Sequence, residues 1–238
     1  MRLNKYLAQA GVASRRAADR LIQDGTVMVN GVLETNPAYQ AQIDDQVEYN
    51  GQKLVLQSGR TVIAFHKPKG VITTAQDPQH RKTVLDYLPQ KKRLFPVGRL
   101  DKDTTGILLL TDDGELANQL LHPRHRVLRV YEAVIDRPFR QWEKRRLSNG
   151  VYIGQKEWGY GNVLDQKTVK KRTTVHLELN HGKKREVRRI MYRMKRELFS
   201  LRRIKFGPIK LGKLAAGEWR ELNEREIKLL EHPSHNEV

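Results

Sequence analysis

The net charge of this chain changes abruptly near Ser58, Gly59 and Arg60. Residues 1–58 hold six Lys or Arg and six Asp or Glu side chains, so the whole excess of +18 lies in residues 59–238. Neither an internal repeat nor a Pro-rich or Ser-rich linker separates the two parts. The sequence therefore predicts two domains, residues 1–58 and 60–238, joined by a short turn, and a polyanion as the partner of the basic domain.

Several classes of protein are excluded by what the sequence lacks. It has no cysteine, which excludes disulfides, thiolate metal sites and a Cys nucleophile. The densest apolar run, Ile107–Leu110, is far shorter than the roughly 20 residues of a transmembrane helix. The first residues contain no apolar core of a signal peptide, and His122 and His125 stand near no Cys or acidic helix. We expect a cytoplasmic globular protein that binds no metal.

The first 33 residues show the pattern of two helices followed by a hairpin. The first helix has apolar side chains at helical spacing and ends at Gly11; the second begins after Ser14 as N-cap and ends before Gly25. The expected buried stripes are Leu3, Tyr6, Leu7 and Ala10 in the first helix and Ala17, Ala18, Leu21 and Ile22 in the second. Asn30-Gly31 predicts a tight turn between strands at 27–29 and 32–33.

Arg15 and Arg16 fall in the first turn of the second expected helix. Cations there oppose the helix dipole by roughly 0.3–1 kcal/mol each, so their placement favours a compensating anion such as an RNA phosphate. The alternative is that both are ordinary solvated surface arginines. The run Arg2–Ala18, followed by Val27–Gly31, resembles the S4 RNA-binding module, in which the second helix and the loop before it lie against structured RNA. That resemblance implies an RNA partner but no particular reaction.

The second region opens with a strand-like segment at 61–65 and contains one strand that must be buried on both faces. Ile107–Leu110 are four large apolar residues bounded by turns. Asp101 stands in the polar loop before them, where a reacting group is often carried. Asp112 and Glu115 resemble a capping box that starts the next helix, whose apolar residues are Leu116, Ala117, Leu120 and Leu121.

The residues alone leave the role of Asp101 open. Asp101 and Asp103 could form a carboxylate pair of the glycosidase kind, but residues two apart would need a wet cleft between them. An Asp in such a loop is more often a turn or cap residue than a catalyst.

The segment Gly98–Gly106 closely resembles the G-R-L-D-x-x-T-x-G motif of pseudouridine synthases. Five further segments resemble motifs of the same family in the same order, one of them typical of its RsuA/RluB branch. They are Lys67–Val71, Asp77–Val84, Val130–Val134, Gly182–Arg189 and Leu201–Ile209. With the S4-like module, the resemblance covers almost the whole chain. It implies an α+β protein: a small helical and β RNA-binding module, then a catalytic domain with a mixed, mainly antiparallel sheet flanked by helices and a cleft across its middle.

The resemblance also implies the roles of individual residues. Asp101 would be the catalytic aspartate, Tyr131 the ring that stacks on the target base, and Arg188 the cation beside the aspartate. The expected substrate-binding residues are Arg99, Leu100, Thr105, Leu201, Lys67 and Arg185. A carboxylate could serve as nucleophile or as the base that removes a ribose proton. Converting uridine to pseudouridine is an isomerisation, so the resemblance implies no cofactor.

The helix expected near residue 190 has a core stripe of Val187, Ile190, Met191 and Met194, with Arg188 at its edge. Arg185, Arg189, Arg193 and Arg196 are expected on its outer face. Residues 183–210 hold twelve basic side chains and only two acidic ones. We assign this excess to the RNA backbone, with Arg15, Arg16, Arg189, Arg193 and Arg203 as the expected phosphate contacts.

The expected partner is a structured hairpin of ribosomal RNA, with no membrane, no small-molecule cofactor and a monomeric protein. The versions of the motifs at 77–84 and 185–189 are more similar to the large-subunit branch, which favours 23S rRNA. The alternatives are a small-subunit rRNA synthase or a non-catalytic RNA-binding assembly factor. Three positions depart from the family pattern: His181 in place of an acidic residue, Arg129 in place of Lys, and Lys195 where Gly usually ends the helix.

Overall fold

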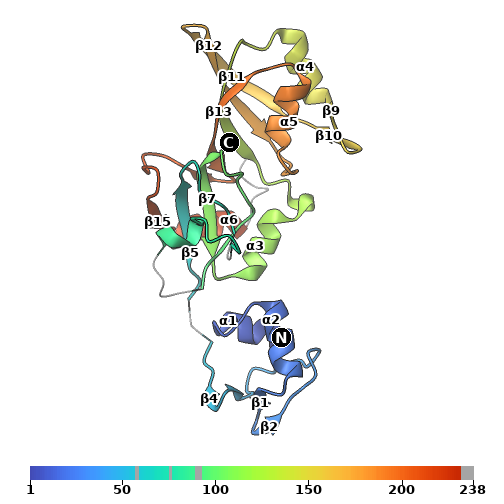
Figure 1. Ribbon diagram of the computed structural model, residues 1–238, viewed down its shortest axis with the longest axis vertical. Helices are drawn as coiled ribbons and strands as arrows, with labels where there is room; N and C mark the ends of the chain where they lie inside the picture. Colours follow the sequence, from blue (N-terminus) through green and yellow to red (C-terminus); the bar gives the residue numbers. More distant parts are fainter. Residues whose placement is uncertain (57–58, 75–76, 89–92, 232–238) are drawn as a thin grey trace. The chain divides into compact units, whose positions relative to one another are not determined.

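The computed structural model describes residues 1–56, 59–74, 77–88 and 93–231 (Figure 1). The chain forms two compact units: the first is built from Met1–Arg60 together with Arg93, and the second from the other described residues after Arg60. Ser58, at the charge step, lies outside the described residues. Within the described ranges, no helix combines the length and the apolar character that crossing a bilayer requires.

Two short helices form one side of the first unit. Helix α1 spans Leu3–Gln9 and buries Leu3, Tyr6 and Leu7 of the predicted stripe, whereas the fourth residue, Ala10, is the C-cap and is half-buried. Helix α2 spans Arg15–Gln23, and the Ser14 hydroxyl accepts a hydrogen bond from the Ala17 amide, which confirms the expected N-cap. The predicted stripe of α2 is too wide, however: Ala18 and Ile22 are buried, whereas Ala17 is exposed and Leu21 is half-buried.

A four-stranded antiparallel sheet completes the first unit. Its order is β2 (Val32–Leu33), β1 (Val27–Val29), β3 (Val47–Tyr49) and β4 (Gln52–Lys53). Asn30 and Gly31 link β1 to β2 with φ values of +53° and +77°, the conformation of the tight turn that their sequence predicts. Val27, Val29 and Val47 pack against the apolar faces of α1 and α2, so this unit has its own core.

The second unit is built on one large sheet. Its strands run in the order β11 (Asn162–Val169), β12 (Arg172–Leu179), β8 (Arg129–Ile135), β13 (Leu198–Phe206), β7 (Thr105–Thr111), β5 (Val62–Lys67) and β15 (Trp219–Glu221). Two short strands join it: β6 (Phe95–Pro96) pairs with β7, and β14 (Ile209–Lys210) pairs with β13. Every pairing is antiparallel except the parallel contact between β13 and β7. The structure confirms the predicted α+β class with a mixed, mainly antiparallel sheet.

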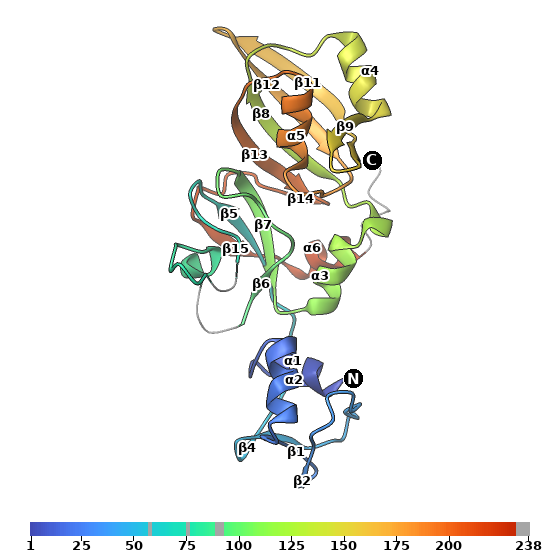
Figure 2. The same ribbon diagram turned by 45° about the vertical axis from the view of Figure 1, so that its right-hand side comes forward.

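Helices cover the sheet of the second unit (Figure 2). Helices α3 (Gly114–Leu121) and α6 (Glu224–Glu231) pack with residues of β5 and β7 in one core. Helices α4 (Gln141–Asn149) and α5 (Glu186–Arg193), with the hairpin of β9 (Val151–Gly154) and β10 (Glu157–Gly159), share another core with β8, β12 and β13. Two short 3-10 helices, η1 (Val84–Tyr87) and η2 (Pro123–His125), lie in the connections.

Strand β7 is buried on both faces, as its sequence predicts. Ile107 and Leu109 belong to the core with α3 and α6, while Leu108 and Leu110 point into a separate cluster on the other face. Gly106, near the start of the strand, has φ +107°, and a Cβ placed on it would lie 2.2 Å from the Arg203 carbonyl oxygen. Only glycine therefore lets β7 come this close to β13.

Local details correct two of the expectations from sequence and explain how a third position, Lys195, is accommodated. The N-cap of α3 is Asp113, which accepts from the amides of Glu115 and Leu116, while Asp112 instead accepts from the Thr61 amide. Arg196 is not on the outer face of α5 but is buried, with its guanidinium 2.6 Å from the Glu143 carboxylate. Lys195 follows the helix with φ +52°, so it adopts the left-handed conformation that glycine usually takes there.

Candidate active site

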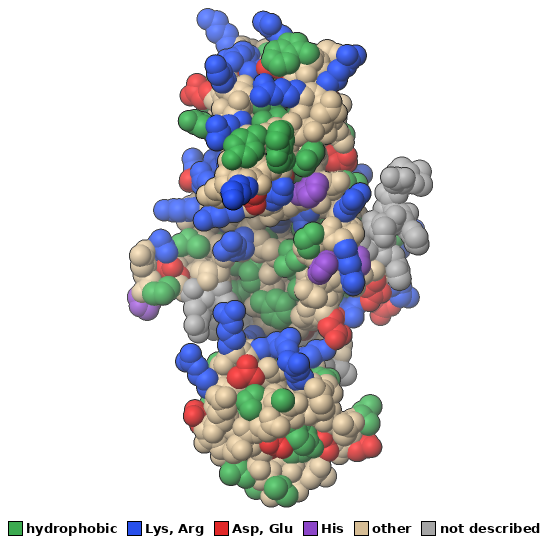
Figure 3. All heavy atoms as spheres, turned by 90° about the vertical axis from the view of Figure 1, so that its right-hand side faces the viewer, with side chains coloured by type: hydrophobic (Ala, Val, Ile, Leu, Met, Phe, Trp, Pro, Cys, Tyr) green, Lys and Arg blue, Asp and Glu red, His purple; other side chains and the backbone are tan. Residues whose placement is uncertain are grey.

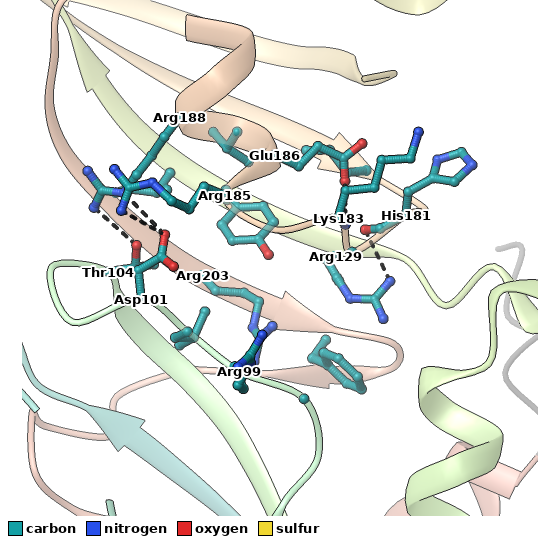
Figure 4. A pocket seen from close by; sticks show the side chains of 18 of the residues that line it. Arg99, Asp101, Thr104, Arg129, His181, Lys183, Arg185, Glu186, Arg188 and Arg203 are labelled. Atoms are coloured by element: carbon teal, nitrogen blue, oxygen red, sulfur yellow. Dashed lines mark hydrogen bonds and ion pairs between the residues drawn. The ribbon is translucent and has the colours of Figure 1, made fainter. Parts of the chain in front are cut away.

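One pocket lies over the central strands of the large sheet (Figure 4). It has a volume of about 100 Å³. Its walls come from the loop before β7, from β8 and β13, and from the end of β12 with the start of α5. Its lining includes Arg99, Leu100, Asp101, Thr104, Arg129, Tyr131, His181, Lys183, Arg185, Glu186, Arg188, Leu201 and Arg203.

Asp101 faces two arginines from the start of α5. Its Oδ2 lies 3.5 Å from Arg188 Nε and 3.9 Å from Arg185 Nη1, and its side chain is one-third exposed. Arg188 is held by a second contact, because its Nη2 donates to the Thr104 hydroxyl at 3.1 Å (Figure 4). The loop of Asp101 and the helix of Arg188 are thus brought together at one end of the pocket.

The backbone of the loop that carries Asp101 is bound by the buried side chain of Lys67. The ammonium of Lys67 donates to three carbonyl oxygens, those of Pro68 at 3.0 Å, Lys102 at 3.3 Å and Thr104 at 3.0 Å. Burial lowers the pKa of Lys67 to about 8, and the charges of Asp103 and Asp101 oppose that shift. Lys67 is fully buried and does not line the pocket, so the predicted substrate contact is wrong. Its contacts position the loop instead.

A second anchor fixes the other side of the same loop. The Thr73 hydroxyl donates to the Leu100 carbonyl at 2.9 Å, and the Leu100 amide lies 3.3 Å from the same hydroxyl. The Gly70 amide donates to the Lys102 carbonyl at 2.8 Å. With these bonds on both sides, the backbone around Asp101 is held in place before any ligand binds.

Tyr131 and Arg203 are cross-strand neighbours on β8 and β13, and both line the pocket. Arg203 is buried, and its Nε donates to the Ile107 carbonyl at 2.8 Å. Burial lowers the pKa of Arg203, and its interaction with Tyr131 opposes that shift. The structure therefore places Arg203 inside the protein at the pocket and not on the outer surface, where a phosphate contact along the RNA backbone was expected.

Arg189 is also engaged inside the protein. It donates to the carbonyls of Ile153 and Gly154 and lies 2.5 Å from the Glu157 carboxylate, which ties α5 to the β9–β10 hairpin. These contacts contradict the expectation that it faces RNA. The other three expected phosphate contacts, Arg15, Arg16 and Arg193, are exposed.

The far end of the pocket brings together two of the departures from the family pattern. The buried Arg129 donates to the carbonyls of Val127 at 2.7 Å and His181 at 3.4 Å. Burial lowers the pKa of Arg129 and also that of His181, whose neighbours Lys183 and Arg126 lower it further. Arg129 therefore contacts the backbone, and not the side chain, of His181.

Glu186 lies next to this end of the pocket at the first position of α5. Its Oε2 accepts from the Lys183 amide at 3.1 Å, which closes the turn in which Arg185 adopts φ +53°. Burial raises the pKa of Glu186, and its contact with the Lys183 amide opposes the shift. Glu186 therefore supports the turn that presents Arg185 and Arg188 to Asp101.

The structure separates the expected substrate-binding residues into two groups. Arg99, Leu100, Leu201 and Arg185 line the pocket, whereas Lys67 and Thr105 do not. Thr105 begins β7 and pairs with Arg202; the neighbouring Thr104 is the threonine that contacts Arg188. Thr104 stands three residues after Asp101, at the threonine position of the G-R-L-D-x-x-T-x-G motif, so the motif spacing could have identified Thr104 as a site residue. No pattern in the sequence indicated a role for Glu186 at the site.

The pocket is strongly cationic. Its lining includes five arginines and Lys183 but only two carboxylates, those of Asp101 and Glu186. Among the residues that the structure describes, no group of three or more His, Asp or Glu side chains could hold a metal ion. This arrangement suits an anionic ligand whose reacting atoms meet a carboxylate held by two guanidinium groups.

Comparison with known proteins gives consistent matches to both units. A family model described as RNA pseudouridylate synthase matches residues 61–192, and one described as S4 domain matches residues 1–47. The ribosomal large subunit pseudouridine synthase B of Bacillus subtilis is 38% identical over 234 residues, which cover 96% of this chain and 95% of that protein. The dual-specificity RNA pseudouridine synthase RluF of Escherichia coli is 34% identical over 242 residues, covering 98% and 81% respectively.

A solved structure described as a crystal structure of pseudouridylate synthase has the same fold. It superposes with a TM-score of 0.68 at 25% identity and covers 97% of this chain and 99% of its own.

Proposed function

The chain belongs to the RNA pseudouridylate synthase family and is an RNA-modifying isomerase with an S4 domain, and from this premise we propose that it converts one specific uridine of 23S rRNA to pseudouridine. The observation that carries the chemical part of this proposal is Asp101, held in a cationic pocket 3.5 Å from Arg188. The large-subunit target is supported by the Bacillus subtilis relative, whose name assigns it to that subunit.

The reaction breaks the bond between ribose carbon 1′ and uracil N1 and forms a bond from the same carbon to uracil carbon 5. The hydrogen on carbon 5 leaves as a proton and N1 gains one, so no oxidant, reductant or group donor takes part. We propose Asp101 as the catalytic residue, acting as nucleophile at the sugar or as base toward a ribose proton. Arg188 orients its carboxylate and Tyr131 stacks on the base.

A uridine in a stem hides both its glycosidic bond and carbon 5, so the base must leave the helix. Flipping costs a few kcal/mol and costs less where the nucleotide already lies in a loop, which supports an RNA hairpin as the substrate. The cationic lining of the pocket favours a nucleotide with its phosphates. We propose that residues 1–58 bind RNA and residues 60–238 catalyse, and that the protein acts as a monomer in the cytoplasm on ribosomal RNA.

The proposal is tested with Asp101→Asn on deproteinised ribosomal RNA carrying tritium at uracil carbon 5, whose release reports the isomerisation. We expect the variant to lose at least about 1,000-fold in rate while it still binds RNA, because the reacting carboxylate is removed and the cations remain. Asp103→Asn is the matched control, since Asp103 is exposed and lies outside the pocket lining. Conversion by Asp101→Asn at the native rate would exclude Asp101 as the catalyst.

The target is identified by pseudouridine mapping of both ribosomal RNAs in a deletion strain. We expect one site to disappear from 23S rRNA. Loss of a site in the small-subunit RNA would overturn the large-subunit assignment, and loss of no site would favour a non-catalytic assembly factor.

A further inference from the structure

The β9–β10 hairpin carries a cluster of exposed aromatic side chains that the pocket does not use. Tyr152 is 45% exposed, Trp158 is 50% exposed and Tyr160, just after β10, is 36% exposed. We call these three residues the aromatic platform. Figure 3 shows hydrophobic side chains gathered among Lys and Arg on the face toward which this hairpin projects. Large aromatic groups grouped on a surface usually mark a binding site.

The inner face of the hairpin is fixed against helix α5. Val151 and Ile153 are buried in the core that α5 shares, and a Cβ on Gly159 would lie 2.8 Å from Ile190, so that strand is pressed onto the helix. Arg189 adds its bonds to the carbonyls of Ile153 and Gly154 and its ion pair with Glu157. The platform therefore belongs to a hairpin that is fixed against α5. Its rings point away from α5 because successive side chains of a strand lie on opposite faces, and Val151, Ile153 and Gly159 face the helix.

The three rings are held in defined positions. Tyr152 and Trp158 are cross-strand partners, with ring centroids 5.8 Å apart in an edge-to-face arrangement. The ring of Tyr160 packs over Gly150, where a Cβ would lie only 2.6 Å from it. A cross-strand aromatic pair by itself stabilises a hairpin by roughly 0.2–1 kcal/mol, which explains the pairing but not why both rings stay half-exposed to water.

Cations lie among the rings. The Arg193 guanidinium is 5.7 Å from the Tyr152 ring, and the Lys183 ammonium is 5.9 Å from the Tyr160 ring and donates to the Trp158 carbonyl. Flat rings alternating with positive charges match the chemistry of unpaired RNA, whose bases stack and whose phosphates are anionic. A protein partner would match these charges only if its surface were acidic.

The platform is continuous with the pocket. The Tyr160 ring lies 5.7 Å from the ring of His181, and both His181 and Lys183 line the pocket. An RNA strand that leaves the pocket at this end therefore passes His181 and reaches Tyr160.

We propose that the aromatic platform of Tyr152, Trp158 and Tyr160 stacks on unpaired bases that flank the flipped uridine, while Lys183 and Arg193 contact their phosphates. This inference rests on the proposed function, since it takes the RNA substrate to be bound in the pocket. It adds a single-strand subsite that selects for unpaired sequence beside the target.

The test measures the affinity of the full-length chain for two probes: an oligouridine of about 8 nucleotides and a perfectly paired RNA duplex with the same number of phosphates. Trp158→Ala should weaken oligouridine binding about tenfold and leave duplex binding unchanged, because stacking needs an unpaired base. Trp158→Phe should keep most of the affinity. Trp219→Ala is the matched control, since Trp219 is a 37% exposed tryptophan on the edge strand β15 and its replacement should change neither affinity.

A second measurement does not require the alanine variant to fold. With Trp142 and Trp219 replaced by Phe, Trp158 is the only tryptophan, and oligouridine should quench its fluorescence while the duplex should not. Unchanged oligouridine affinity in Trp158→Ala, an equal loss for both probes, or no quenching would each overturn the inference. Failure of the proposed function is seen separately, as absence of uridine conversion by the native chain whatever its affinity for oligouridine.

Discussion

Thr104 links the two elements that form the candidate site. Its hydroxyl accepts from Arg188, its carbonyl accepts from Lys67, and its amide donates to the Asp101 carbonyl at 3.0 Å. It is nearly fully buried, so these contacts are protected from water. Thr104 is therefore a positioning residue that sets the geometry between Asp101 and Arg188.

Thr104→Val keeps the shape of the side chain and removes the acceptor for Arg188. Hydrogen bonds to charged groups contribute about 1.5–3 kcal/mol, so we expect kcat to fall about tenfold or more, with little change in RNA affinity. Single-turnover kinetics and RNA binding measure the two effects separately. Thr104→Ser, which restores the hydroxyl, should recover most of kcat; a serine variant as slow as the valine variant would show that the hydroxyl is not what matters.

Lys67 gives a pH dependence whose sign follows from its burial. Its pKa is about 8 in the folded protein, against 10.5 for an unperturbed lysine. Below pH 8 the side chain of Lys67 is protonated in both the folded and the unfolded chain. Between pH 8 and pH 10.5 it binds more protons in the unfolded chain than in the folded one. The contribution of Lys67 to the free energy of unfolding therefore rises with pH in this interval.

Lys67→Met cannot titrate and should lack this rise. Urea unfolding of both proteins between pH 8 and pH 10.5 measures it as a steeper increase of the free energy of unfolding with pH in the native chain. Parallel pH profiles for the two proteins would show that the three carbonyls keep Lys67 charged throughout.

At the scale of elements, the approach of β7 to β13 positions both the Asp101 loop and Leu201 and Arg203 of the pocket. This parallel contact is short, joining Arg202 to Thr105 and Arg203 to Gly106. A Cβ on Gly106 would collide with the Arg203 backbone, so the pairing of β7 with β13 depends on the absence of a side chain at this position.

Gly106→Ala should destabilise the protein by at least about 3 kcal/mol, because the added Cβ would collide with the backbone of Arg203 and the φ of +107° is strained for alanine. Gly212→Ala is the matched control: it also has a positive φ, of +59°, but no atom within 4 Å of the added carbon, and should cost about 1 kcal/mol. Thermal and urea unfolding measure both, and equal losses would show that backbone conformation rather than the close approach limits position 106.

At the scale of the whole molecule, the charge of +18 overstates the surface available to RNA. Arg129, Arg196 and Arg203 are buried, and Arg189 is engaged with the hairpin. In residues 1–58, whose net charge is zero, Arg15 and Arg16 are exposed at the start of α2. In this region the positions of a few exposed cations such as Arg15 and Arg16, and not the total charge, should determine the affinity for RNA.

Replacing Arg15 and Arg16 together by Ala in the full-length chain should lower RNA affinity and reduce the slope of log K against log salt concentration by about 2, since each phosphate contact contributes about 0.9. Salt titrations of hairpin RNA binding measure this slope. Replacing Arg15 and Arg16 together by Lys keeps both charges and should keep the native slope of log K against log salt concentration. If the alanine variant retains the native slope, the two arginines are solvated surface residues.

The sequence by itself determined the features that depend on neighbours along the chain. Apolar spacing identified α1 and the core stripe of α5, the run Ile107–Leu110 identified a strand buried on both faces, and the motif around Asp101 identified the family. Local propensity and motif spacing are carried by residues close in sequence, so they can be interpreted without the fold. The cap of α3 was misplaced by one residue because Asp112 bonds to Thr61, 51 positions away.

Only the tertiary structure decided which basic residues face outward. Arg203 donates to Ile107 across 96 residues, Arg196 pairs with Glu143 across 53, and Arg189 bonds to Ile153 across 36. Sequence periodicity places a side chain relative to the axis of its own helix or strand but contains no information on what packs against that face. Arg203 and Arg196 are buried and Arg189 is half-buried because carbonyls or a carboxylate from a distant segment contact each guanidinium, and these contacts form only once the sheet, α5 and the hairpin have come together.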